Sequence, residues 1–97
     1  MKSCIYEIKI GQYYYIGKDM LNKRKREHLN LLIKNKHYNK FMQNAFNKYQ
    51  EFNFSILEEG DFSREELNQK EIETIKAYRE KYTKEKIMNL TDGGDGG

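Results

Sequence analysis

The chain has 97 residues and a net charge of +3, and 37% of its residues are hydrophobic while 34% are charged. This length fits one small domain with a modest core of Ile, Leu, Phe and Tyr side chains. Its single cysteine excludes an internal disulfide bond, no apolar run approaches the roughly 20 residues of a membrane-spanning helix, and the N-terminus lacks the apolar segment of a signal peptide. We therefore expect a soluble cytoplasmic protein.

The charge is unevenly distributed along the chain. Residues 18–48 contain nine Lys or Arg and two acidic residues, whereas residues 51–85 contain ten acidic residues and six Lys or Arg. The basic half is suited to binding a phosphate backbone. A solvated, lysine-rich surface explains the same pattern equally well.

Residues 4–17 predict a β-hairpin. Apolar and polar residues alternate in CIYEIKI, Gly11 and Gln12 form a two-residue turn of the type II′ kind, and YYYIG returns. Counting back from the turn gives the opposed pairs Ile10 and Tyr13, Ile8 and Tyr15, and Tyr6 and Gly17. Because side chains alternate along a strand, one face carries Cys4, Tyr6, Ile8, Ile10, Tyr13, Tyr15 and Gly17, and the other carries Ile5, Glu7, Lys9, Tyr14 and Ile16.

A first helix is expected to begin at Asp19, as its N-cap, and to end near Lys34. Arg24 and His28 are four residues apart, so both lie on or next to the buried stripe. The apolar residues of this stripe and of its borders are Met20, Leu21, Leu29, Leu31 and Leu32.

A second helix is predicted over residues 39–49, after a break at residues 35–39, and a strand over residues 52–57. Residues 58–62 are expected to form a loop. The helix side chains expected to face inward are Phe41, Met42, Ala45, Phe46 and Tyr49.

A third helix is predicted from the capping box of Ser63 and Glu66 to about Tyr82. Its apolar stripe contains Glu71, where an aliphatic residue is expected. A carboxylate in that position is costly unless it is paired or binds a metal ion. The alternative is a glutamate at the edge of the stripe that pairs with a lysine.

The end of the chain is expected to form a short extended segment at residues 87–90 and then a flexible, Gly-rich tail. The predicted order of elements is β-β-α-α-β-α. Two adjacent antiparallel strands, with helices between and after the strands, indicate an α+β domain.

Several side chains form a candidate site for phosphodiester chemistry. Tyr6 and Tyr15 are diagonal neighbours on one face of the hairpin, and Gly17 leaves a phosphate-sized gap opposite Tyr6. Arg24 can bind a phosphate oxygen, and His28 can transfer a proton near neutral pH. Each feature has a structural alternative, namely cross-strand aromatic packing for the tyrosines and a solvated helix edge for the Arg–His pair.

Two further residues lie at breaks in the regular pattern. His37 lies between two predicted helices, where it either starts the second helix or supports the site. Asn89 follows an apolar Ile-Met pair and is suited to anchoring a loop. Together the candidates include a water activator, a carboxylate for a divalent metal ion and cations for the developing charge, which phosphodiester hydrolysis requires.

These motifs resemble the signature of the GIY-YIG nuclease family. CIY at residues 4–6 and YIG at residues 15–17 are similar to its two signature tripeptides. Arg24, His28 and Glu71 match residues that the family carries on its first and later helices, and Asn89 matches a late Asn before a Gly-rich ending. His37, AFNKY and FSILEE resemble the phage and group I intron homing-endonuclease branch, and the similarity covers essentially all 97 residues.

The resemblance implies an α+β fold with a three-stranded antiparallel sheet flanked by about three helices. Residues 1–92 would form the catalytic domain and residues 93–97 the start of a linker to a separate DNA-binding region. It implies a metal-dependent DNA endonuclease with one divalent ion on Glu71, Mg²⁺ or alternatively Mn²⁺, and no small-molecule cofactor. A monomer acting on DNA in the cytoplasm of a bacterial or phage-infected cell is expected.

The resemblance also implies roles for the site residues. Tyr6 would be the general base, with His28 assisting it or taking the proton, Arg24 would steady the phosphate, and Tyr15 would orient the water or phosphate. A phenol with a free pKa of ~10 is a poor base at neutral pH, so nearby cations must favour its deprotonation. The supporting residues would be Gly17, Lys18, His37 and Asn89, and the DNA-binding residues would be Lys23, Lys25, Arg26, Lys36 and Lys40.

Two departures from the family pattern stand out. Cys4 replaces the first Gly of the signature, and the segment between Gly17 and Arg24 is shorter than the family norm. The alternative functions are a structure-specific or repair nuclease with the same site, and a non-catalytic DNA-binding or protein-interaction module that keeps the fold.

Overall fold

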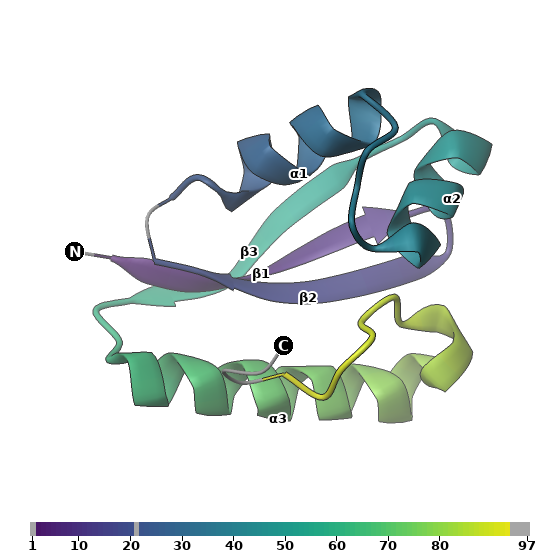
Figure 1. The fold of residues 1–97 in the computed structure, drawn as a ribbon. Coiled ribbons are helices and arrows are strands. Elements are labelled where there is room, and N and C mark those ends of the chain that lie inside the picture. Colours follow the sequence, from purple (N-terminus) through teal and green to yellow (C-terminus); the bar gives the residue numbers. More distant parts are fainter. Residues whose placement is uncertain (1, 21, 94–97) are drawn as a thin grey trace.

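The computed structural model describes residues 2–20 and 22–93. Three strands form one antiparallel sheet in the order β2-β1-β3. Helices α1 and α2 cover one face of the sheet and α3 covers the other (Figure 1). The elements are β1 (Ser3–Ile10), β2 (Tyr13–Asp19), α1 (Arg24–Ile33), α2 (Lys40–Tyr49), β3 (Asn53–Gly60), α3 (Arg64–Tyr82) and a short 3₁₀ helix η1 (Lys84–Lys86).

This arrangement confirms the predicted α+β class and the order of strands and helices. The hairpin register is also confirmed, since Ile10, Ile8 and Tyr6 pair with Tyr13, Tyr15 and Gly17. Gly11 has a φ of +61°, and Gln12 is not among the positive-φ residues, as a type II′ turn requires. Within the described residues, no helix is both long and apolar enough to cross a membrane.

The two faces of the hairpin pack into two separate cores, as the alternation predicts. The core beneath α1 and α2 contains Cys4, Tyr6, Ile8, Ile10, Leu32, Met42, Ala45 and Met88, with all five inward residues predicted for α2 buried in it or packed against it. The core beneath α3 contains Ile5, Ile16, Leu67 and Ile75. Burial of these side chains is what fixes the helices on their respective faces.

Helix α1 begins four residues later than predicted, because its N-cap is Lys23 and not Asp19. Asp19 is the last residue of β2, where it pairs with Cys4, and Asn22 has a positive φ of 54° that interrupts the chain before the helix. The Asp19 carboxylate nevertheless accepts a hydrogen bond of 3.0 Å from the Arg24 backbone N–H, so it satisfies one free donor at the helix start. Met20 therefore packs beside the α3 core from outside the helix, and Leu21 lies outside the described residues.

Strand β3 is longer than the predicted strand, and residues 58–60 belong to it rather than to a loop. A bulge opposite Ile5 and Tyr6 shifts the register, after which Ile5, Cys4 and Ser3 pair with Glu58, Glu59 and Gly60. The charged EEG segment resembles a loop in sequence. It forms a strand here because β3 is an edge strand of the sheet, where exposed charged side chains are tolerated.

The segment after α3 returns to the sheet. Ile87 forms a parallel bridge with Tyr14, and the Met88 N–H donates a hydrogen bond of 2.7 Å to the Tyr14 carbonyl. The predicted short extended segment is thus confirmed. Its pairing with β2 carries Asn89 to the same edge of the sheet as Gly17.

Candidate active site

A cavity of about 360 Å³ lies where β1, β2, the start of α1, α3 and the segment after Met88 meet. Seven of the predicted site residues line it, namely Tyr6, Tyr15, Gly17, Lys18, Arg24, Glu71 and Asn89. His28 and His37 lie behind the Tyr6 side of the cavity and are both buried. The fold therefore brings together residues that are up to 83 positions apart, from Tyr6 to Asn89.

The Tyr6 phenol occupies the space that the missing side chain of Gly17 leaves. A Cβ atom at position 17 would lie 2.3 Å from both Cζ and Oη of Tyr6. The predicted phosphate-sized gap opposite Tyr6 is therefore wrong, because the Tyr6 ring itself fills it. Glycine is required at position 17 so that the Tyr6 ring can lie across the neighbouring strand.

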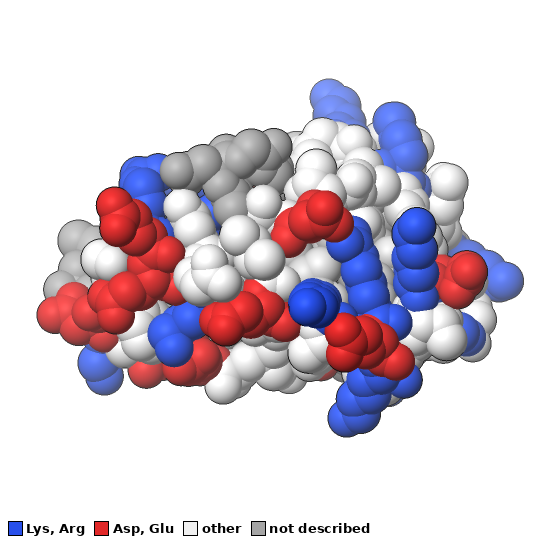
Figure 2. Space-filling view, turned by 90° about the horizontal axis from the view of Figure 1, so that it is seen from below, with Lys and Arg blue, Asp and Glu red and all other residues white. Residues whose placement is uncertain are grey.

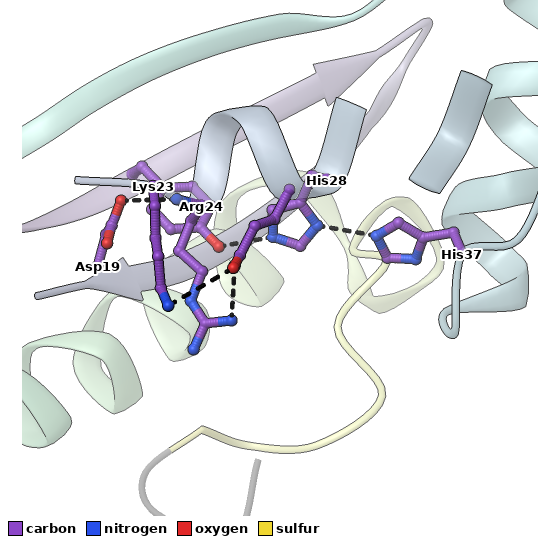
Figure 3. A network of polar contacts seen from close by, with 7 residues as sticks. Asp19, Lys23, Arg24, His28 and His37 are labelled. Carbon is purple, nitrogen blue, oxygen red and sulfur yellow. Dashed lines mark hydrogen bonds and ion pairs between the residues drawn. The ribbon is translucent and has the colours of Figure 1, made fainter. Parts of the chain in front are cut away.

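Behind Tyr6, two histidines continue a chain of hydrogen bonds (Figure 3). The Tyr6 hydroxyl lies 2.8 Å from Nε2 of His28, and Nδ1 of His28 lies 2.8 Å from Nε2 of His37. The backbone N–H of Asn39 donates a hydrogen bond of 3.0 Å to Nδ1 of His37. The chain therefore runs from the N-cap of α2 to the phenol of β1.

The Asn39 N–H sets the direction of every bond in this chain. Burial, followed by the charges of His37 and Arg24, lowers the pKa of His28 to about 4, and burial also lowers the pKa of His37. Both rings are thus neutral at pH 7, and each carries one N–H. Since His37 accepts at Nδ1, it donates from Nε2 to His28, and His28 in turn donates from Nε2 to the Tyr6 oxygen.

Arg24 and Glu27 form the exposed side of the site. Arg24 is the first residue of α1, its side chain is 50% exposed, and its Nη1 lies 3.3 Å from Oε1 of Glu27. The Nζ of Lys23 also approaches Glu27, at 3.7 Å from Oε2. The Arg24 guanidinium therefore lies at the mouth of the cavity rather than on the buried face.

Glu71 reaches the cavity from α3, on the opposite face of the sheet. It is 8% exposed, and its Oε1 lies 3.5 Å from Nζ of Lys18, which also donates a hydrogen bond to Oδ1 of Asn68. Glu71 is therefore buried within the stripe, as predicted. It also pairs with a lysine, which was expected only for a glutamate at the edge of the stripe. Gly93 packs beside it, since a Cβ there would lie 3.3 Å from Oε1.

The chemistry of this donor set fits a hydrated divalent cation. Within the described residues, no group of three or more His, Cys, Asp or Glu side chains is arranged to hold a metal ion. Among the described residues that line the cavity, Glu71 is the one carboxylate, and the cavity has room for water and phosphate oxygens. Magnesium is commonly bound by one or two carboxylates together with waters and substrate phosphates.

Asn89 anchors the last segment to β2 through both ends of its amide. Its Oδ1 accepts a hydrogen bond of 2.9 Å from the Ile16 N–H, and its Nδ2 donates one of 2.7 Å to the Ile16 carbonyl. The Arg79 guanidinium holds the same segment through the carbonyl of Thr91 at 2.9 Å. These contacts confirm the predicted loop anchor and place Thr91 and Gly93 on the cavity wall.

Four lining residues, Tyr38, Arg64, Thr91 and Gly93, were not among the predicted site residues. Arg64 is seven positions before Glu71 on α3, so helical periodicity could have placed both on one face. Tyr38 follows His37 directly, but nothing in the local pattern shows where its ring points. Residues 94–97, the rest of the predicted linker, lie outside the described residues.

The five residues predicted to contact DNA are all exposed, and they lie at the N-cap and in the first turn of α1, between α1 and α2, and at the start of α2: Lys23, Lys25, Arg26, Lys36 and Lys40. The face seen from the α3 side is different, since acidic and basic side chains interleave on it (Figure 2). The half of the chain predicted to be acidic therefore does not form a purely acidic face, because α3 carries lysines and arginines among its glutamates.

Comparison with known proteins gives one informative match. No family model matches the chain, and no curated protein sequence matches it significantly. Among solved structures, a point mutant of the catalytic domain of intron endonuclease I-TevI superposes with a TM-score of 0.79 and 31% sequence identity, covering 95% of this chain and 96% of that one. The chain belongs to the GIY-YIG nuclease family. The resemblance of the two tripeptides to the family signature, and the fold it implied, are thereby confirmed.

We predict that Gly17→Ala displaces the Tyr6 phenol from this GIY-YIG site. The added methyl group overlaps the Tyr6 ring, so the free energy of unfolding should fall by about 1–3 kcal/mol. Urea denaturation measures the loss. Gly60→Ala is the matched control, because the nearest atom there is the edge of the movable Phe62 ring, and an equal or larger loss in that variant would contradict the prediction.

The buried, neutral His28 predicts a pH-dependent stability. Its pKa is about 4 in the folded chain and 6.5 when exposed, so below pH 6.5 the unfolded chain binds more protons. The free energy of unfolding should therefore fall as the pH drops from 6.5 towards 4, by about 1.4 kcal/mol per pH unit from this residue. Denaturation curves of the wild type and His28→Gln measure this slope, and identical slopes would refute it.

Proposed function

We propose that this GIY-YIG domain is the catalytic domain of a metal-dependent DNA endonuclease of the homing type. The observation that carries the proposal is the shared cavity, to which β1, α1 and α3 contribute Tyr6, Arg24 and Glu71 respectively. The likeness to the catalytic domain of an intron endonuclease supports a nuclease function. It also favours the homing type over the other nuclease roles considered for this fold.

In this proposal Glu71 holds a single divalent cation, Mg²⁺ or Mn²⁺. When bound, the cation would polarise a phosphate oxygen and stabilise the negative charge that develops on it. Lys18 neutralises Glu71 in the protein alone, at 3.5 Å. With the carboxylate engaged, the Lys18 ammonium would turn to a phosphate oxygen within the same cavity.

Tyr6 is proposed as the base that takes a proton from the attacking water. Burial, with the neighbouring Tyr15, raises the pKa of Tyr6, while the positive charge of Arg24 lowers it. The His28 N–H points at the Tyr6 oxygen, and such a donor stabilises a phenolate more than a phenol. Of the two roles expected for His28, the direction of the hydrogen-bond chain therefore supports assistance by hydrogen bonding over acceptance of the Tyr6 proton.

The covalent step is an in-line displacement at phosphorus. Tyr6 first loses its phenolic proton to solvent in the cavity, a loss that the Arg24 charge and the His28 N–H favour and burial opposes. The water oxygen then forms a new P–O bond as its proton passes to the Tyr6 oxygen. The P–O bond to the leaving sugar oxygen breaks, and that oxygen takes a proton from solvent water. Arg24 at the mouth of the cavity would bind the non-bridging oxygens. Arg64 lines the same cavity and would add a second guanidinium on the α3 side.

The exposed cations of α1 would hold the DNA backbone beside the cleavage site. Lys23 is the N-cap of this helix, and Lys25 and Arg26 follow Arg24 in its first turn. Contacts of this kind are electrostatic and independent of sequence. Binding by this domain should therefore weaken steeply as the salt concentration rises.

Glu71→Gln tests the role of the carboxylate. Glutamine keeps the size of the side chain but not its charge, so Mg²⁺-dependent nicking of supercoiled plasmid should fall by about 100-fold or more. EDTA should abolish nicking by the wild type. Glu73→Gln, an exposed position two residues away on α3, is the matched control and should remain active. Equal activity of the two variants, or nicking in EDTA, would contradict the proposal.

Tyr6→Phe tests the base. Removing the hydroxyl should lower kcat by about 100- to 10,000-fold with little change in KM, since proton transfer occurs in the chemical step. Tyr13→Phe is the control, because Tyr13 lies at the far end of the hairpin, packed on Phe41 and Tyr49. Full activity of Tyr6→Phe would exclude Tyr6 as the base.

A further inference from the structure

A second cavity adjoins the catalytic one. It has a volume of about 390 Å³ and is lined by Arg24, Glu27, His28, Asn30, Leu31 and Tyr38. Arg24 and Tyr38 line both cavities, so these two side chains form the boundary between them. None of the roles proposed for the catalytic site uses this second cavity.

Tyr38 presents one aromatic face to solvent at this boundary. It is 64% exposed, more than any other aromatic side chain of the described residues. Its ring stacks on the His37 imidazole, with the centroids 4.4 Å apart and the planes 29° apart. One face of the phenol is therefore covered and the other is available.

The support beneath Tyr38 is rigid. His37 is completely buried, its backbone N–H donates a hydrogen bond of 3.0 Å to Oε1 of Gln43, and its two ring nitrogens are bonded to Asn39 and His28. A fixed support holds the exposed ring in one orientation. Such a ring loses little conformational entropy when a flat ligand stacks on it.

The charges around the second cavity favour an anionic ligand. Glu27 is the one acidic residue of its lining, and both Arg24 and Lys23 lie within 4 Å of its carboxylate. Lys25 and Arg26 add exposed positive charge on the same helix. An exposed aromatic ring next to a guanidinium is the combination that binds a nucleotide, the ring taking the base and the cation taking the phosphate.

We propose that the second cavity receives an unpaired nucleobase of the DNA, which stacks on the exposed face of Tyr38 beside the phosphate that Arg24 binds. This inference rests on the proposed function, since it takes DNA as the substrate. The base must be unpaired because in a duplex both of its faces are already covered by neighbouring bases. Stacking of this kind accepts all four bases, because each has a π-face.

Binding of single strands in EDTA tests the proposal without cleavage. The probes are a fluorescent oligothymidylate and an abasic oligomer of equal length, which has the same phosphates but no bases. Fluorescence anisotropy should show that Tyr38→Ala weakens binding of oligothymidylate about 5- to 150-fold, the range for loss of one stacked base. The abasic oligomer should bind the wild type and Tyr38→Ala equally.

Two further variants separate the ring from its hydroxyl and from general surface changes. Tyr38→Phe keeps the ring and should bind oligothymidylate as the wild type does. Ile33→Ala removes an exposed apolar side chain elsewhere on α1 and should also bind normally. The proposal is overturned if Tyr38→Ala binds oligothymidylate normally, if it loses equal affinity for the abasic oligomer, if Tyr38→Phe is as weak as Tyr38→Ala, or if the wild type binds neither strand.

These outcomes are distinct from those of the nuclease assays. Base-dependent binding through Tyr38 without any metal-dependent nicking would refute the endonuclease and retain the nucleobase site. Nicking that depends on Glu71, together with normal oligothymidylate binding by Tyr38→Ala, would retain the endonuclease and refute the nucleobase site.

Discussion

The structure depends on the hydrogen-bond chain that starts at the Asn39 backbone and ends at the Tyr6 oxygen. A backbone N–H can only donate, so the tautomers of both His28 and His37 are fixed from one end. Reversing either ring would leave buried polar atoms unpaired, which costs more than the loss of an exposed hydrogen bond. Within the described residues, every buried side-chain nitrogen and oxygen has a partner. The packing of α1 and α2 on the sheet is thereby tied to the position of one phenol.

The site is divided into a neutral, buried half and a charged, accessible half. Tyr6 and the two histidines lie on the α1 and α2 side of the sheet, where burial lowers the histidine pKa values. Lys18, Arg24 and Glu71 line the open cavity, where water and phosphate can reach them. This division keeps the two histidines uncharged behind Tyr6 and, in the proposed mechanism, leaves Lys18, Arg24 and Glu71 beside the reacting phosphate.

The residues next to each of the two departures from the family pattern accommodate it without a change in the fold. Cys4 occupies the place of the first signature Gly as a small, buried strand residue of the α1 and α2 core. The short connection between Gly17 and Arg24 is held at both ends, because Asp19 pairs with Cys4 in the sheet and accepts a hydrogen bond from the Arg24 N–H. Arg24 thus keeps the four-residue spacing to His28 and reaches the cavity.

The sequence by itself determined the hairpin register, the capping box of α3, the burial of Glu71 and the anchoring by Asn89. These follow from short-range rules, since turn length, strand alternation and helical period decide which face a residue occupies. Only the tertiary structure decided that β2 and not α1 contains Asp19, that the Tyr6 ring fills the space beside Gly17, and that Tyr38 and Arg64 line the cavity. Those features depend on partners distant in the chain, whose approach is set by packing and not by local preference.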